Sequence, residues 1–383
     1  FDFCLSNAVM ELVFSADIPV NVFDASSTRD RRDPEICMTI LSSSALPQIA
    51  VLGAGLPGRE YAARLQARGQ FAGYVDPTSA GVYAVSQGIE VTDSCDRLIE
   101  TSAVQGAIIA TTPDETLEAS CAALRAGLPI LIDPAFLDRR EDAEVIDALA
   151  ADQGLSAVMG WKRRFHPEVR QLRQLLSGQQ LGQLVSCHVT SWMSKPDGFF
   201  TDVNWSNRPY AGPIMSQLTV DIDLLRSLFG EIRDVSGMAG SPGKGLPIAD
   251  ACVLIVRFSS GLLATVNVAD AVAAPFNWHL ASGDDPNYSH TDQSCYWIAG
   301  THGSVTMPNA VLWHYGPSGP DWFQRIQRDP KPVEAPVGAE ADALLDAWTE
   351  MLVDPNQPLS CTVSDALQTF QVLDWIRRIL NDV

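Results

Sequence analysis

The stretch IAVLGAGLPG, which runs from Ile49 to Gly58, decides the fold of this chain. Its first four residues are apolar and predict a short buried strand, and a GxGxxG turn follows at once. Residues 59–68 favour a helix because alanine, leucine and long polar side chains dominate them. A GxGxxG pattern indicates a dinucleotide-binding site when it lies between a strand and a helix, as it does here.

Each small residue of this turn has an expected role. Gly53 permits the tight turn, Gly55 leaves room for a pyrophosphate beside the backbone, and Gly58 lets the helix pack closely on the strand. Pro57 suits the first helical turn, where its missing N–H needs no partner. The phosphates would bind at the helix N-terminus, around Leu56, because free N–H groups and the helix dipole favour negative charge there.

A second predicted strand, Phe71 to Val75, ends in an acid at a meaningful distance. Asp76 follows Gly58 by 18 residues, close to the spacing of about 20 that is typical of a ribose-binding carboxylate. The alternative is that Asp76 only caps a turn before Pro77. An acid at this place favours NAD over NADP because it repels the 2′-phosphate, so we predict NAD as the cofactor.

The composition excludes several classes of partner. The chain has 383 residues, of which 46% are hydrophobic and 19% are charged, so two globular domains are expected. The net charge is −20 and no basic run is present, which speaks against nucleic acid and anionic membranes as partners. No apolar run approaches the roughly 20 residues needed to span a bilayer.

The eight cysteines are scattered and form no CxxC pair or Cys/His cluster with the spacing of a metal site. We therefore expect a reduced protein without a bound metal. Phe1 to Val20 lacks a basic leader, so a secretory signal is not expected and the cytoplasm is the predicted location.

Three segments are predicted. Residues 1–46 show no periodicity and are interpreted as an extension that is disordered or not native, with Met38 as a candidate start. Residues 47–160 alternate strands and helices, which predicts a doubly wound parallel sheet, the Rossmann arrangement. Because ligands bind beyond the carboxyl ends of such strands, Thr111, Thr112, Pro113 and Asp133 should face the same crevice as the glycine turn.

Residues 161–383 have a different pattern. Residues 252–258 and 262–268 alternate around Ser259-Ser260-Gly261, and 296–299 and 304–307 flank a second turn, so two hairpins are expected. Helices are predicted at 218–229, 339–352 and 364–380, and the last of them may return to the first domain. This predicts a second α/β domain with an open, mostly antiparallel sheet.

From about residue 47 onward the chain resembles the glucose-fructose oxidoreductase, inositol dehydrogenase and rhizopine-catabolism (Gfo/Idh/MocA) family. The motifs that carry the resemblance occur in the family's order: GAGLPG at 53–58, VDP at 75–77, TTPDETLEASCAALRAGLPILID at 111–133, RRFHPEV at 163–169, DIDLLRSLFGEI at 221–232 and GTHGSVTMP at 300–308. The resemblance implies a Rossmann domain, a C-terminal α/β domain, and NAD(P)-dependent oxidation or reduction of a sugar, cyclitol or related polyol.

The chain departs from the family where the family places its reactive side chains. The family's Glu-Lys-Pro signature corresponds to Asp133-Pro134-Ala135, so the lysine that polarises the reacting group is absent. The family's Asp and His, four residues apart, correspond to Ser216 and Val220. Proton transfer in step with hydride transfer needs a titratable group at the reacting carbon, and these changes remove the usual ones.

Other residues are candidates to replace them. Lys162 or Asp221 would serve as acid or base, with a solvated lysine and a helix-capping carboxylate as the alternatives. The candidate substrate-binding residues are Arg164, Trp205, Gln217 and His279.

We therefore expect an NAD-dependent oxidoreductase with altered catalytic positions. The alternative is a pseudoenzyme that binds the nucleotide and acts as a sensor or assembly partner without redox turnover. The expected ligand is a small molecule. The open sheet of the second domain predicts a homodimer or homotetramer, since a broad exposed apolar face usually has a partner.

Overall fold

The structure, a computed structural model, describes residues 46–383 except 77–84, 86–90, 102, 197–212, 241–250, 286–287, 317–318, 330–335, 358 and 382–383. The predicted extension at the N-terminus and the candidate residue Trp205 therefore lie outside the described residues. The side chains of residues 213–216, which include Ser216, are also outside them.

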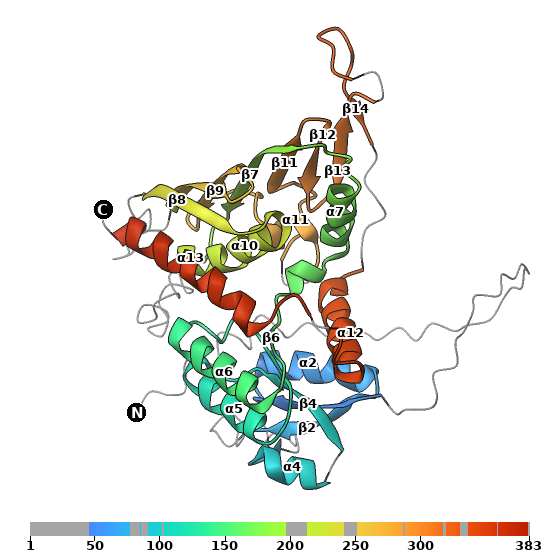
Figure 1. Cartoon of the computed structure of the whole chain (residues 1–383), viewed down its shortest axis with the longest axis vertical. Helices are drawn as coiled ribbons and strands as arrows, with labels where there is room; N and C mark the ends of the chain where they lie inside the picture. Colours follow the sequence, from blue (N-terminus) through green and yellow to red (C-terminus); the bar gives the residue numbers. More distant parts are fainter. Residues whose placement is uncertain are drawn as a thin grey trace, which may run out of the picture. The chain divides into compact units, whose positions relative to one another are not determined.

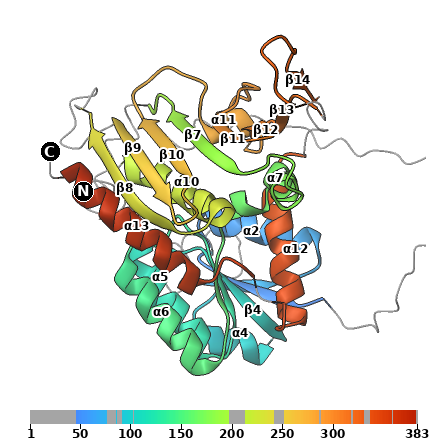
Figure 2. The same cartoon turned by 45° about the horizontal axis from the view of Figure 1, so that its top comes forward.

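The first sheet has six parallel strands, which confirms the predicted Rossmann arrangement. Its strands lie in the order β3-β2-β1-β4-β5-β6 (Figures 1 and 2). Their bounds are β1 (Gln48–Leu52), β2 (Phe71–Val75), β3 (Val91–Thr92), β4 (Val104–Ile109), β5 (Ile130–Ile132) and β6 (Ala157–Met159). The chain reverses its direction across the sheet between β1 and β4, and such a reversal opens a crevice at the carboxyl ends of the two strands.

Helices connect these strands. They are α2 (Leu56–Ala67), α4 (Cys95–Thr101), α5 (Pro113–Arg125) and α6 (Arg140–Gln153). The strand β1 is buried almost completely because β2 and β4 flank it and α2 packs on it. This burial explains the unbroken apolar run at Ile49–Leu52, which is typical of a central parallel strand.

The second sheet has eight strands in the order β14-β13-β12-β11-β7-β10-β9-β8. Their bounds are β7 (Leu184–Trp192), β8 (Ile232–Ala239), β9 (Ala251–Phe258), β10 (Leu263–Ala269), β11 (Tyr296–Gly300), β12 (Gly303–Met307), β13 (Val311–His314) and β14 (Gln327–Arg328). Both predicted hairpins are present, as β9–β10 and β11–β12. The pair β7–β10 is parallel and the other pairs are antiparallel, so the sheet is mostly antiparallel, as predicted.

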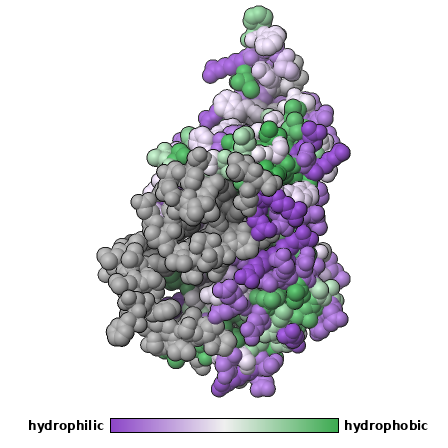
Figure 3. All heavy atoms as spheres, turned by 90° about the vertical axis from the view of Figure 1, so that its left-hand side faces the viewer, coloured by the Kyte–Doolittle hydropathy of each residue, from purple (hydrophilic) through white to green (hydrophobic). Residues whose placement is uncertain are grey.

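One face of this sheet is covered. In β9 the side chains alternate strictly, with Leu254 and Val256 buried and Val253 and Ile255 exposed. The helices α10 (Pro213–Phe229) and α13 (Val363–Asn381) pack on the buried face. Apolar side chains are visible on the upper half of the surface in Figure 3, level with the second sheet in Figure 1.

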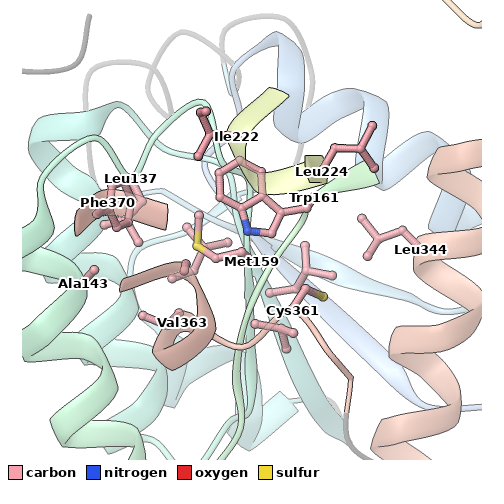
Figure 4. Close-up of a cluster of buried hydrophobic side chains, with 14 of the residues drawn as sticks. Leu137, Ala143, Met159, Trp161, Ile222, Leu224, Leu344, Cys361, Val363 and Phe370 are labelled. Atoms are coloured by element: carbon pink, nitrogen blue, oxygen red, sulfur yellow. The ribbon is translucent and has the colours of Figure 1, made fainter. Parts of the chain in front are cut away.

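The last two helices contact the first domain. Met159 at the end of β6 donates its N–H to the carbonyl of Cys361 at 2.7 Å, and α13 packs on α6. Side chains from both halves of the chain, among them Met159, Trp161, Ile222 and Phe370, form one buried apolar cluster (Figure 4). The helix α12 (Ala339–Val353) joins the two domains further through ion pairs between Asp342 and both Arg64 and Arg68 of α2.

Two local expectations need correction. The helix predicted from Leu218 begins five residues earlier, at Pro213, because a proline fits the first helical turn. The loop-like composition around the candidate His279, rich in Asn, Asp and Pro, predicts a loop, but His279 lies in the short helix α11 (Trp278–Ser282). The side chain of Asn277 accepts a hydrogen bond from the N–H of His279. In the described part of the chain, no helix is both long and apolar enough to cross a bilayer.

Candidate functional site

The glycine turn is built so closely that two of its glycines are required. Gly53 has a φ of +104°, and a Cβ added there would lie 2.3 Å from the carbonyl oxygen of Ala110. A Cβ on Gly58 would lie 1.9 Å from the carbonyl oxygen of Gly53. Any larger residue would push the turn, the helix and β4 apart, which is the physical reason for these positions of the fingerprint.

Gly55 differs from the other two. A Cβ there would meet only Pro57, at 4.0 Å, and otherwise open space. The backbone therefore leaves a place beside the turn that a side chain would fill. Gly55 is also the N-cap of α2, so no side chain caps the first turn of this helix. The combination fits a pyrophosphate, because the helix N-terminus offers N–H donors at an uncrowded backbone.

Asp76 holds the turn from the end of β2. Its side chain is buried, and Oδ2 accepts a hydrogen bond from the N–H of Ala54 at 2.8 Å. This contact orients the turn, and it places a carboxylate beside it, as the ribose-binding role requires. The turn-cap alternative before Pro77 lies at the edge of the described residues.

The Thr-Pro segment lies at the carboxyl end of β4, as expected. Thr112 forms a capping box with Glu115 at the start of α5, and Pro113 occupies the first helical turn. Thr111 is tied to the same helix, with its Oγ1 atom 3.1 Å from that of Thr116. Their side chains fix the start of α5 and so shape the rim of the crevice next to the glycine turn.

Asp133 ends β5 and is held from two sides. Its Oδ2 accepts a hydrogen bond from the hydroxyl of Tyr61 at 2.8 Å and lies 3.8 Å from Nζ of Lys162. The same ammonium lies 5.1 Å from the centre of the Tyr61 ring. Lys162 and Asp133 are thus brought together, and burial, followed by the nearby Asp133 charge, raises the pKa of Tyr61 well above its ordinary value.

Lys162 also lines a cavity of about 970 Å³ between α2 and α12. The cavity wall includes Glu60, Arg64, Arg68, Asp284, Glu340 and Asp342. Of the described residues that the sequence assigned to cofactor, substrate or catalysis, only Lys162, a candidate acid/base, belongs to this wall. Through its pair with Asp133 it also reaches the carboxyl end of β5.

Asp221 takes part in a buried network through one of its two carboxylate oxygens. Its Oδ1 accepts hydrogen bonds from the guanidinium of Arg163 and the hydroxyl of Tyr296. Arg164, beside it, pairs with Asp223 and with Asp365 of α13. Burial raises the pKa of Asp221, and the Arg163 charge opposes that rise. These contacts give Asp221 and Arg164 a structural role that the sequence did not reveal, because their partners are distant in the chain.

Gln217 lies on α10 among polar groups from other elements. Its Oε1 accepts from Nδ2 of Asn277 at 3.3 Å, and its Nε2 lies 3.3 Å from the sulfur of Met193. Two residues beyond Met193 lies Lys195, which the sequence reasoning missed. Its side chain is 7% exposed and its Nζ lies 2.9 Å from Oδ2 of Asp270. Burial lowers the pKa of Lys195, and the Asp270 charge opposes this change.

His279 lies close enough to the same polar groups to respond to their charges. Burial lowers its pKa to about 4, and the positive charges of Arg163 and Lys195 contribute. The imidazole is therefore neutral near pH 7, and its ring stacks on Tyr288 with centroids 5.0 Å apart. A neutral imidazole has one donor and one acceptor nitrogen, whereas the protonated ring has only donors.

Pro134 and Val220, the positions that the resemblance aligns with the family's lysine and histidine, carry no titratable side chain. Pro134 lies beside Gly160, with its Cδ 3.5 Å from the place of a Cβ on that glycine. Val220 is half-buried and packs against the apolar core. Lys195, in the second domain, lies outside all the motifs that carry the resemblance. A single lysine outside any motif does not indicate a functional site in the sequence.

Comparison with known proteins agrees with this architecture. Residues 169–306 match the family model described as the GFO/IDH/MocA C-terminal domain. An inositol 2-dehydrogenase of Saccharopolyspora erythraea is 28% identical over 236 residues, which are 58% of this chain and 66% of that protein. The match thus spans slightly less than two thirds of the relative's length.

Solved structures share the fold over most of their length. UDP-N-acetylglucosamine 3-dehydrogenase GnnA from Acidithiobacillus ferrooxidans superposes with a TM-score of 0.65 at 20% identity, covering 87% of this chain and 97% of that one. The WlbA dehydrogenase from Bordetella pertussis, solved with NADH and UDP-GlcNAcA, gives 0.64 at 15% identity, with 88% and 97% covered. With the two sheets and the glycine turn described above, these matches show that residues 169–306 resemble the GFO/IDH/MocA C-terminal domain and that the whole chain shares the fold of these dehydrogenases.

Proposed function

We propose that the protein is an NAD-dependent oxidoreductase that acts on a secondary hydroxyl of a sugar, cyclitol or related polyol. The observation that carries the cofactor assignment is the open place beside Gly55 at the uncapped start of α2, with Asp76 next to it. When bound, NAD supplies the hydride acceptor. The residues that would hold it are Gly53 to Gly58, Asp76, Thr111 to Pro113 and Asp133. Asp76 favours NAD over NADP because its carboxylate would repel the negatively charged 2′-phosphate of NADP.

The second domain would supply the proton acceptor through Lys195. A lysine with a lowered pKa is a better base near neutral pH than an exposed one. Lys195 lies three residues after the end of β7. Met193, two residues before it, contacts Gln217 on α10. This helix also carries Val220, which the resemblance aligns with the family's histidine. Asp270 holds the ammonium in place. Gln217 and the neutral His279 would then position the substrate hydroxyls.

Lys162 remains the competing candidate for this role. Its side chain is 33% exposed and pairs with Asp133 at the carboxyl end of β5. However, it faces the cavity between α2 and α12 rather than Gln217. The two assignments predict opposite orders of kcat for substitutions of Lys195 and Lys162. Comparing the two variants therefore identifies the lysine that acts as acid or base.

Turnover is tested by following NADH absorbance with a panel of aldoses, cyclitols and nucleotide sugars, each with NAD and then with NADP. The proposal expects NAD reduction with at least one polyol, and less with NADP. If no member of the panel reacts while NADH still binds, the pseudoenzyme alternative replaces the oxidoreductase. That alternative rests on Pro134 and Val220, the positions at which the family's lysine and histidine are absent.

We also propose that a second copy of the chain covers the open face of the second sheet. Val185, Val253, Ile255, Leu263 and Trp297 are large apolar residues exposed on strands whose alternate residues are buried. The exposed apolar residues occur on several neighbouring strands and so form one patch, as is typical of an interface. The variant Ile255→Glu should lower the molar mass measured by light scattering, whereas an unchanged mass in wild type and variant would contradict the proposal.

A further inference from the structure

A histidine and two carboxylates converge beside the cavity, and the proposed reaction uses none of them. His166 follows the short helix η1 (Lys162–Phe165) and precedes α7 (Pro167–Ser177). Asp284 follows α11, and Glu340 lies in the first turn of α12. One ligand-type atom from each of the three lies within 4.8 Å of the other two. Residues far apart in the chain therefore meet at one point.

Within the described part of the chain, each of the two carboxylates has one buried oxygen without a hydrogen-bond partner. The side chains of His166 and Asp284 are 2% and 7% exposed. Asp284 Oδ1 accepts from the N–H of Gly338, but its Oδ2 is buried and has no hydrogen-bond partner among the described residues. The same holds for Oε2 of Glu340. A buried carboxylate oxygen without a donor is costly, so the arrangement calls for a bound positive charge.

Glu168 makes the histidine suitable as a ligand. Its Oε2 lies 2.6 Å from Nδ1 of His166, whereas Nε2 of the same ring lies 3.9 Å from Oδ2 of Asp284. A carboxylate behind one ring nitrogen orients a metal-binding imidazole and makes the other nitrogen a stronger donor. Glu168 thus occupies the place of the outer carboxylate in a carboxylate–histidine–metal arrangement.

We propose that His166, Asp284 and Glu340 bind one divalent transition-metal ion, with Glu168 orienting the histidine. One imidazole nitrogen and two carboxylate oxygens suit Mn²⁺, Fe²⁺ or Zn²⁺ better than Mg²⁺, which prefers oxygen ligands and water. At metal–ligand distances of about 2.1 Å, neighbouring donors in a tetrahedral or octahedral site lie about 3.0–3.4 Å apart. Nε2 of His166 and Oδ2 of Asp284, which are 3.9 Å apart, would therefore move closer by less than about 1 Å.

The ion has a route to the site and a consequence for the fold. Asp284 and Glu340 both line the 970 Å³ cavity, whose wall carries six acidic residues and three basic ones: Glu60, Asp284, Asp285, Glu340, Asp342 and Asp346 against Arg64, Arg68 and Lys162. Because the ligands come from η1–α7, the segment after α11 and α12, a bound ion would fix the start of α12, which pairs with α2. No bound metal is predicted from the sequence, because residues 166, 284 and 340 are too far apart in the chain to form a recognisable motif.

A proton is the competing occupant. Burial, followed by the charge of Asp284, raises the pKa of Glu340 to about 7, so two carboxylates sharing a proton would also satisfy the site. Added metal distinguishes the two occupants. If the site is a metal site, the ion binds at the atoms of His166, Asp284 and Glu340; if a shared proton satisfies the carboxylates, added metal does not bind there.

The test uses untagged full-length protein, treated with EDTA and dialysed, and follows free Mn²⁺ by electron paramagnetic resonance. Mn²⁺ avoids competition from the buried cysteines because thiolates prefer softer ions. The proposal expects one Mn²⁺ per chain with Kd below about 100 µM, displaced by Zn²⁺, and a Tm that rises with Mn²⁺. Asp284→Asn and Glu340→Gln should each weaken binding at least 10-fold, and Glu168→Gln by about 10-fold.

Asp285→Asn is the matched control, because it removes the same charge from the same cavity wall and should leave the affinity unchanged. Circular dichroism establishes that each variant is folded. Absence of Mn²⁺ binding up to about 1 mM in wild type, or equal affinity in wild type, Asp284→Asn and Glu340→Gln, would overturn the proposal in favour of a shared proton.

Discussion

The two domains differ in how much of the family's chemistry they retain. In the first, Gly53 and Gly58 leave no space for a side chain, and Asp76 holds the turn through Ala54. In the second, Val220 packs into the core at a family catalytic position, and the first domain contributes Pro134 where a lysine is expected. The glycine turn thus has the close packing that its expected role requires, whereas Pro134 and Val220 offer no group for the proton transfer that the resemblance implies.

This difference has a physical cause. The glycine turn is constrained by backbone atoms of β1, β4 and α2, so almost any substitution there disturbs the fold itself. A proton acceptor is constrained only by reach and by its pKa. A lysine elsewhere in the chain, such as Lys195 after β7 with its lowered pKa, could therefore supply this function, as we propose.

The largest effect is expected from Gly58→Ala. A methyl group 1.9 Å from the carbonyl oxygen of Gly53 cannot be accommodated unless α2 moves, and overpacking of this kind costs about 3 kcal/mol. The variant should show a Tm several degrees lower in a thermal melt and should lose NADH binding. Gly69→Ala, at a positive φ but with open space around it, is the control and should cost only about 1–2 kcal/mol. Equal losses in both would mean that the turn is looser than described.

The next effect separates the two lysines. Lys195→Met should lower kcat by about 10²–10⁴-fold, because this is the usual contribution of a general base. Lys162→Ala should change kcat less than about 10-fold, since its partner Asp133 also has the hydroxyl of Tyr61. Steady-state kinetics on the best polyol of the panel measures both. The reverse order of effects would transfer the acid/base to Lys162.

The pH dependence sharpens the same assignment. Because burial lowers the pKa of Lys195 below its ordinary 10.5, its neutral form becomes available at lower pH than for an exposed lysine. For polyol oxidation, kcat/KM should rise with pH and level off well before 10.5. His279 should add no limb near pH 6.5, because its pKa of about 4 keeps it neutral throughout. A limb near 6.5 that disappears in His279→Gln would make the histidine the titrating group instead.

Much of the fold could be predicted from the sequence because its signals are local. The apolar run before Gly53, the two hairpin turns and the helical stretches near the C-terminus all depend on neighbouring residues. The positions of Asp221, Lys195 and His166 could not be predicted in the same way. Each is defined by a partner on another element, Arg163 and Tyr296 for the first, Asp270 for the second, and Asp284 with Glu340 for the third. Spacing along the chain contains no information about such contacts.

The central claim is that the glycine turn binds a nicotinamide dinucleotide, and titration of NADH fluorescence tests it most directly. Wild type should saturate with NADH and bind NADPH more weakly, and Asp76→Ala should reduce this difference. Gly55→Asp should abolish binding while it leaves Tm nearly unchanged, because a side chain there fills open space and meets little of the protein. Equal NADH affinity in wild type and a folded Gly55→Asp variant would contradict the account.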